Sequence, residues 1–197
     1  MDARHWDERY EATELVWSAG PNATVAEQVS GLEPGTALDL GSGEGRNAVW
    51  LAEQGWMVTA VDFSRVATDK ALAAARARAV TIDAVTADVT TYRPQRSFDL
   101  VLVAYLQLPW EQLGPVLATA AAAVAPGGVF LLVAHDLTNL AEGAGGPQDP
   151  AVLQTPTQVA GALGGLRVTT AERIRRPVEQ EGRTVHAIDT LIRAAAP

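Results

Sequence analysis

Short apolar runs alternate with amphipathic stretches along most of this chain. The runs have the length of strands and are nearly uninterrupted, which predicts strands at residues 37–40, 57–61, 80–85, 98–104 and 129–134. Strands that are apolar on both faces are typical of a parallel sheet covered by helices on both sides. The pattern therefore predicts an α/β fold with a doubly wound sheet.

The stretches between these runs have helical spacing. Gly55 stands where a helix would end, and Ser64 is placed as the N-cap of a long alanine-rich helix. A Pro-Gly-Gly sequence at 126–128 is expected to end a helix before the fifth strand. We expect helices at 47–54, 64–79, 110–125 and 157–163.

Both ends of the chain depart from this alternation. Residues 1–30 carry two short helical patterns with aromatic anchors, which predicts a helical lid in front of a core that spans residues 31–197. Residues 137–155 read as one long irregular loop, and such loops are often functional. The runs 168–174 and 185–192 have no helix between them, so they can pair antiparallel.

Composition narrows the class of protein. The 197 residues suit one domain, 1–197, and 48% of them are hydrophobic. A net charge of −8 without a long basic run disfavours nucleic-acid binding. The absence of cysteine excludes disulfides, thiolate metal sites and a cysteine nucleophile, and three dispersed histidines form no recognisable metal site. With no signal region and no apolar run of membrane length, we expect a cytoplasmic protein, monomeric or homodimeric.

The most informative segment is ALDLGSGEGRN, residues 37–47, in which glycines alternate between a strand and a helix. Such a turn can leave backbone N–H groups pointing at one spot, which predicts binding of the negative end of a nucleoside-type ligand. A dinucleotide loop would have glycine in place of Arg46, and a P-loop would continue with Gly-Lys. A plain structural turn is the remaining alternative.

Three aspartates accompany the turn. Asp62 ends the second strand, where a carboxylate can accept hydrogen bonds from both ribose hydroxyls, although it could also simply start a turn before Ser64. Asp88 follows the third strand, where an adenine amino group would arrive. Alternatively, Asp88 is a solvated loop residue. Asp39 sits in an apolar strand and needs a partner, either a ligand ammonium or a nearby backbone N–H.

Together the motifs LDLGSGEG, VD at 61–62, AD at 87–88 and FDLV at 98–101 resemble class I S-adenosylmethionine-dependent methyltransferases over roughly residues 36–135. The resemblance implies a Rossmann-like, seven-stranded sheet whose last strand runs antiparallel, and S-adenosylmethionine as the cofactor. It implies that the cofactor is bound by Asp39, Gly41, Ser42, Gly43, Gly45, Arg46, Asp62, Phe63, Asp88, Val89, Ala104 and Tyr105.

Within this set the resemblance also implies separate roles. The glycines would line the methionine part, and the aspartate before them would approach its amino group. Asp62 would hold the ribose, Asp88 and Val89 would frame the adenine, and Ala104 and Tyr105 would lie near the sulfonium.

A finer resemblance is to the small bacterial tellurite-resistance and thiopurine methyltransferase-like branch. It rests on WDERY at residues 6–10 and on GRN at residues 45–47. Many relatives have cysteine where Ser42 stands; both side chains are small, so binding should survive the difference.

Methyl transfer is an in-line displacement at carbon, so it depends on alignment and needs a base only if the acceptor loses a proton. His135 follows the fifth strand at the sheet edge where open α/β sheets bind ligands; it could be a base or an ordinary loop histidine. Tyr10 is the second catalytic candidate. The candidates for acceptor contact are Trp6, Trp17, Trp110 and Asn139, with ordinary packing as the alternative for the aromatic residues.

These features predict a methyltransferase that acts on a small molecule, with a sulfur, oxygen, nitrogen, halide or chalcogen acceptor that the sequence does not identify. Two other functions stay open. One is a regulatory protein that binds S-adenosylmethionine without catalysis, and the other is a nicotinamide-dependent oxidoreductase.

Overall fold

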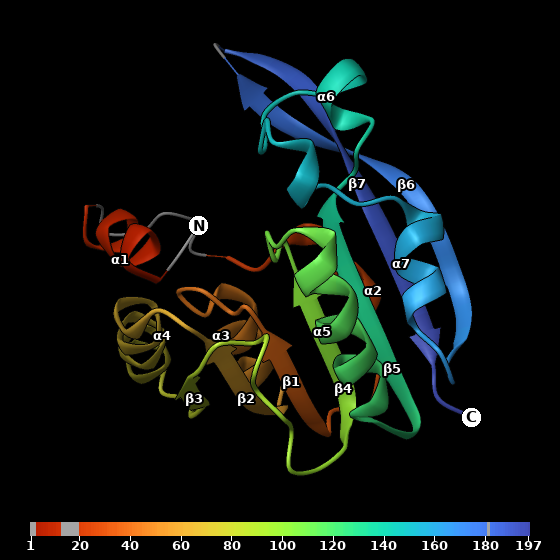
Figure 1. Ribbon diagram of the computed structural model, residues 1–197. Coiled ribbons are helices and arrows are strands. Elements are labelled where there is room, and N and C mark those ends of the chain that lie inside the picture. The colour runs from red at the N-terminus through yellow and green to blue at the C-terminus, as the bar shows by residue number, and fades with distance from the viewer. Residues whose placement is uncertain (1–2, 13–19, 181) are drawn as a thin grey trace.

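The computed structural model describes residues 3–12, 20–180 and 182–197 (Figure 1). Its helices and strands follow one another in the order α1 Ala3–Glu11, α2 Ala23–Val29, β1 Thr36–Leu40, α3 Arg46–Glu53, β2 Met57–Asp62, α4 Arg65–Ala77, β3 Asp83–Thr86, β4 Phe98–Ala104, α5 Trp110–Ala122, β5 Val124–His135, α6 Asn139–Glu142, the 3-10 turn η1 Pro150–Val152, α7 Pro156–Ala162, β6 Arg167–Gln180 and β7 Arg183–Ala195. No helix in this described part is long and apolar enough to cross a membrane.

The strands form one seven-stranded sheet in the order β3-β2-β1-β4-β5-β7-β6. The strands β1 to β5 pair in parallel, whereas β7 runs antiparallel to both β5 and β6. The predicted α/β fold, with its mostly parallel sheet and antiparallel last strand, is confirmed. The chain reverses its direction of winding between β1 and β4, and ligands of open α/β sheets bind at that point.

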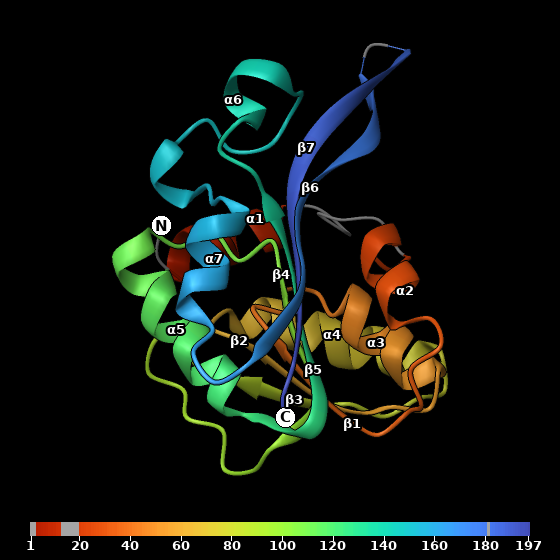
Figure 2. The same ribbon diagram turned by 90° about the vertical axis from the view of Figure 1, so that its right-hand side faces the viewer.

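Helices cover both faces of the sheet (Figure 2). The helices α2, α3 and α4 bury one face, where Leu51 and Leu100 are fully enclosed, and α5 and α7 bury the other, around Leu117 and Phe130. Strands that are apolar on both sides are explained by these two layers, because each strand contributes side chains to both cores.

The first helix lies against α4 and not on the sheet. Trp6 and Tyr10 pack with Ala67, and the Ser64 hydroxyl donates a hydrogen bond to the Asp7 carboxylate. The Lys70 ammonium donates to the Tyr10 carbonyl at 2.6 Å. Apolar contact and hydrogen bonds thus hold α1 beside the carboxyl end of β2.

One strand boundary differs from the prediction because glycine permits an unusually close approach. The Pro-Gly-Gly sequence at 126–128 lies inside β5, which already pairs with β4 at Val124 and shifts register next to it. A Cβ on Gly128 would lie 3.0 Å from the carbonyl oxygens of Phe98 and Asp99. The sequence therefore builds a bulge within the strand and does not separate the helix from it.

Three other boundaries differ. The strand β3 begins at Asp83 and not at residue 80. The expected loop at 137–155 contains α6 and η1. The last hairpin is longer than predicted, because β6 and β7 stay paired as far as Gln180 and Arg183, whereas β5 pairs with β7 only up to Asp189. The rest of the hairpin projects beyond the sheet as a two-stranded arm, visible at the top of Figure 1.

Substitution of Gly45 by alanine should destabilise the fold more than the same change at Gly31. Both glycines have positive φ, +80° and +88°, which costs an alanine about 1–2 kcal/mol. At Gly45 the new Cβ would also lie 2.6 Å from the Cβ of Ala71, which adds about 1–3 kcal/mol of overpacking, whereas nothing lies within 4 Å at Gly31. Urea denaturation measures both variants, and equal losses would contradict the close packing of α3 on α4.

Candidate active site

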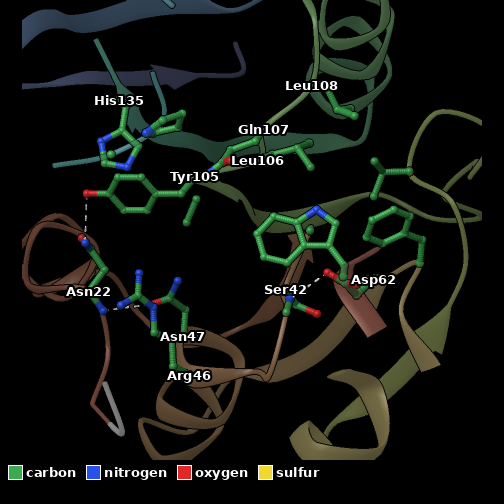
Figure 3. Close-up of a pocket in the computed structure, with 18 of the residues that line it drawn as sticks. Asn22, Ser42, Arg46, Asn47, Asp62, Tyr105, Leu106, Gln107, Leu108 and His135 are labelled. Carbon is green, nitrogen blue, oxygen red and sulfur yellow. Dashed lines mark hydrogen bonds between the residues drawn. The ribbon is translucent and has the colours of Figure 1, made fainter. Parts of the chain in front are cut away.

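A cavity of about 1370 Å³ opens at the carboxyl ends of the parallel strands. Its wall is formed by the glycine turn, by the ends of β2, β3, β4 and β5, by α1 and by the hairpin arm. Figure 3 shows Asp62 at one end of this cavity and Tyr105 with His135 at the other. Large, enclosed clefts with a few convergent polar groups are typical of small-molecule sites.

The glycine turn is closed by its own backbone. Gly41, Gly43 and Gly45 all have positive φ, and the amides of Gly41 and Ser42 donate to the Val61 carbonyl at 2.8 and 3.0 Å. The Gly43 amide donates to Asp62, and that of Gly45 to Ser42. The prediction of free N–H groups for the negative end of a ligand is wrong for these four amides, because they are already bonded within the protein. The turn is therefore poorly suited to a phosphate chain.

Asp62 joins the turn to the end of β2. One carboxylate oxygen accepts from the Gly43 amide at 2.8 Å, and the other accepts from the Ser64 amide at 2.9 Å. Burial raises the pKa of Asp62, although these backbone hydrogen bonds oppose the shift. Each oxygen retains a lone pair for a further donor, so the carboxylate can receive two ligand hydroxyls on the cavity side.

Behind the turn, Asp39 is 1% exposed, and neither of its carboxylate oxygens has a hydrogen-bond partner among the described residues. Burial, followed by the charge of Asp62, raises the pKa of Asp39 to about 7, while Arg46 opposes the shift. The Ser42 hydroxyl is also buried without a partner in the described part of the chain. Buried polar groups are normally paired, so these atoms indicate a missing cationic or donor group next to the turn.

At the ends of β2 and β3, the cavity is lined by both apolar and polar side chains. Phe63 and the buried Val89 line the cavity together with Asp88, at the ends of β2 and β3. One Asp88 oxygen accepts from the Thr90 amide and hydroxyl at 2.8 and 2.7 Å. These contacts fix the orientation of the carboxylate beside the apolar side chains of Phe63 and Val89.

Tyr105 lines the cavity and connects three segments of the chain through its hydroxyl group. It has a φ of +56°, which is rare for an aromatic residue and indicates backbone strain after β4. Its hydroxyl donates to Asp189 at 2.7 Å and accepts from Asn22 at 3.3 Å and from Arg176 at 3.0 Å. Burial and the Asp189 charge raise its pKa, so the phenol stays protonated and acts as a donor.

His135 ends β5 next to Tyr105, with 4.8 Å between the two ring centres. Its Nδ1 atom lies 3.3 Å from one oxygen of Asp189, which is fully buried. The other Asp189 oxygen accepts from Arg176 Nε at 2.7 Å. Burial would raise the pKa of Asp189, but the contact with His135 and the hydrogen bonds from Arg176 and Tyr105 outweigh it and lower that pKa.

The remaining predicted residues divide into two groups. Gly41, Ser42, Gly43, Arg46, Ala104, Trp6 and Tyr10 line the cavity, as do Asp62, Phe63, Asp88, Val89, Tyr105 and His135, whereas Asp39 lies buried in β1 and is not part of the cavity wall. Trp110 is the first residue of α5 and packs, partly buried, against the core, and Gly45 lies so close to Ala71 that it has no room for a Cβ. Asn139 bonds the Gly145 carbonyl and the Ile188 amide, so it supports the loop and not the cavity wall. Trp17 lies outside the described residues.

Three residues of the site were missed from the sequence: Asn22, Arg176 and Asp189. Asp189 could have been found by the rule that identified Asp39, because it is an acidic residue within the apolar strand β7. Asn22 and Arg176 carry no such signal. Asn22 is an ordinary N-cap of α2, and Arg176 is one of several arginines in a polar strand.

The sheet order, the antiparallel last strand and the position of the cavity define the Rossmann-like fold of class I S-adenosylmethionine-dependent methyltransferases. Residues 37–128 match a family model described as a methyltransferase domain. A 114-residue stretch is 29% identical to Hemagglutinin 1 of Eikenella corrodens, covering 57% of this chain and 38% of that protein. The chain thus spans well under half the length of that relative.

Solved structures agree with this fold. A structure from work on the conversion of a disulfide bond into a thioacetal group during echinomycin biosynthesis matches with a TM-score of 0.78, at 21% identity over 98% of this chain and 91% of the other. TehB from Haemophilus influenzae gives 0.75, at 16% identity over 99% and 67% of the two chains. The N-methyltransferase NodS from Bradyrhizobium japonicum, with bound S-adenosyl-L-homocysteine, gives 0.74, at 18% identity over 100% of both.

The unpaired Asp39 predicts a distinctive dependence of stability on pH. Its pKa is raised in the folded state, so its ionisation opposes folding, and stability falls as pH rises from about 4 to about 7. Asp39→Asn removes this loss, and its stability relative to wild type should increase over that interval by up to on the order of 4 kcal/mol. Urea denaturation at both pH values measures the change.

Asp99→Asn is the matched control, because the pKa of Asp99 is shifted in the opposite direction from that of Asp39. The amide and hydroxyl of Thr36 donate to Asp99 and lower its pKa, so its contribution to stability is lost as pH falls. The Asp99 variant should therefore be destabilised more at neutral than at acidic pH. The same pH trend in both variants would contradict the unpaired state of Asp39.

Proposed function

We propose that this protein transfers a methyl group from S-adenosylmethionine to a small molecule. The observation that carries the proposal is the pairing of a closed glycine turn with the unpaired carboxylate of Asp39. The four bonded amides disfavour a pyrophosphate, which a nicotinamide cofactor would bring, and the buried anion favours a ligand with an ammonium group. An amino-acid nucleoside without phosphate satisfies both conditions.

The residues of the cavity fit the parts of that cofactor. The glycine turn, with the buried Asp39 behind it, would receive the methionine end, Asp62 the ribose hydroxyls, and Phe63, Asp88 and Val89 the adenine. Ala104 and Tyr105 would lie beside the reacting centre. When bound, S-adenosylmethionine supplies a methyl group on a positively charged sulfur.

The chain's own contribution is alignment and exclusion of water. We call the glycine turn at residues 41–45 together with Asp62 the cradle. The cavity that contains the cradle is also lined by Trp6 and Tyr10 from α1 and by the segment 144–147, which supports the proposed role of residues 1–30 as a lid. Alignment alone can supply about 7–11 kcal/mol of a displacement barrier. His135 and Tyr10 stay the candidates for proton transfer, and the single-domain, monomeric or homodimeric and cytoplasmic state stays a prediction.

Calorimetry with S-adenosyl-L-homocysteine tests the cradle. Asp62→Ala should weaken binding by roughly 100- to 10,000-fold, because two hydrogen bonds to a charged group are lost. Asp69→Ala is the control and should bind as wild type does, because Asp69 is an exposed residue of α4 that is paired with Arg65. Absence of binding by the intact protein, or equal binding by the Asp62 variant, would refute the proposed cofactor site.

A screen with methyl-labelled S-adenosylmethionine tests the chemistry. Thiols, phenols, amines, halides and chalcogen oxyanions serve as candidate acceptors, and we expect label to appear in at least one of these classes. Binding of the cofactor without transfer to any of them would favour the regulatory alternative. Tight binding of NADH or NADPH would favour the oxidoreductase.

A further inference from the structure

The histidine at the end of β5 is held on three sides. Tyr105 packs against one side of the ring, with 4.8 Å between ring centres and an interplanar angle of 53°. Gly146 lies close to another side, so that an added Cβ would lie 3.0 Å from both Cε1 and Nδ1 of His135. Nδ1 itself faces Asp189 at 3.3 Å. The position of the ring is therefore determined by its surroundings, although it lies at the edge of a large cavity.

His135 and Asp189 face each other with two polar atoms that lack hydrogen bonds in the described part of the chain. Nδ1 of His135 and Oδ1 of Asp189 are both buried, and neither forms a hydrogen bond within the described residues. They face each other within 3.3 Å, so a small rotation of the ring would complete the bond. Because a carboxylate can only accept, the neutral imidazole carries its proton on Nδ1. Its Nε2 atom then keeps a free lone pair, and no described residue occupies it.

The other oxygen of Asp189 is fixed independently. Arg176 Nε and the Tyr105 hydroxyl both donate to Oδ2 at 2.7 Å. Three charged groups belong to this network: Asp189 from β7, Arg176 from β6, and Arg46 from α3, which lies 6.0 Å from the centre of the Tyr105 ring. Asp189 is the only anion among these groups, so it stabilises a positive charge that forms on the ring.

We propose that His135 is the general base of the methyl transfer, that Asp189 and Gly146 position it, and that the acceptor is an O–H or N–H group that must lose a proton. This inference rests on the proposed function, because it places the reacting centre beside Ala104 and Tyr105. His135 lies on the neighbouring strand, two residues beyond Val133, which pairs with Ala104. A halide, a thiolate or a chalcogen oxyanion already has its attacking lone pair and would need no such base.

The proposed step is balanced. A bond forms between the acceptor oxygen or nitrogen and the methyl carbon as the carbon–sulfur bond breaks, and the electron pair of that bond goes to sulfur, leaving a neutral thioether. The proton of the acceptor goes to Nε2 of His135, and the resulting imidazolium faces Asp189. Asp189 itself stays ionised throughout, as orienting carboxylates in such pairs do.

The acceptor class is tested by the labelled-methyl screen with His135→Gln beside the wild type. Label should appear in the phenol or amine class, and the variant should lose about 100- to 10,000-fold in rate. His186→Gln, at an exposed position on the arm, is the control and should keep the wild-type rate. Transfer confined to iodide or selenite, or an equal rate in the His135 variant, would overturn the proposal.

The positioning role of Asp189 is tested by nitrogen NMR of 15N-histidine-labelled protein at about pH 8.5, above the ordinary histidine pKa. The chain has only three histidines, so His135→Gln assigns the signals. Wild type should show Nδ1 protonated and Nε2 free. In Asp189→Asn, Arg176 and Tyr105 hold the amide oxygen, so the NH2 group faces the ring, and the proton should move to Nε2. The exposed His186 should be unchanged.

A second pair of variants tests the packing of the ring without altering any charge. Gly146→Ala should shift the His135 nitrogen signals, whereas Gly145→Ala should not, because both glycines have positive φ but only at Gly146 would the added Cβ meet the ring. Neither measurement needs an acceptor. A wild-type ring protonated on Nε2, or the same tautomer in Asp189→Asn, would overturn the general base while S-adenosyl-L-homocysteine binding still upheld the cofactor site.

Discussion

The carboxylate of Asp62 is the constraint around which the cavity is arranged. It joins the end of β2 to the Gly43 amide and to the start of α4 at Ser64. These two hydrogen bonds hold a turn in which three glycines have positive φ, so that the backbone curves away from the sheet without a side chain in the way. The same carboxylate keeps acceptor capacity on the cavity side. One residue therefore fixes the shape of the cradle and offers its main polar contact.

Three buried aspartates of the sheet and its strand ends differ in how fully their carboxylate oxygens are hydrogen-bonded. Asp136 is satisfied by Thr138, Thr190 and Arg173, and its role is structural. Neither oxygen of Asp39 has a hydrogen-bond partner in the part of the chain that the structure describes. Asp189 has one oxygen satisfied and the other turned to His135. The degree of satisfaction separates a structural aspartate from one that awaits a ligand, because an unpaired buried charge is costly.

Much of the fold could be predicted from the sequence, since each core strand is apolar on both faces. The hairpin arm could not be predicted, because β6 alternates polar residues without a buried face. The cradle was located by three glycines and Asp62, but the bonding of the turn amides depends on the Val61 carbonyl, which no local pattern shows. The pairing of His135 with Asp189 depends on β5 and β7 being neighbours, and strand order is a property of the folded chain.

A crystal structure of the protein with S-adenosyl-L-homocysteine would test the proposed site most directly. We predict that the ribose hydroxyls lie within hydrogen-bond distance of Asp62, that the ammonium group lies on the side of the turn nearest Asp39, and that the thioether sulfur lies between Ala104 and Nε2 of His135. A ligand bound outside this cavity, or one whose sulfur points away from His135, would contradict it.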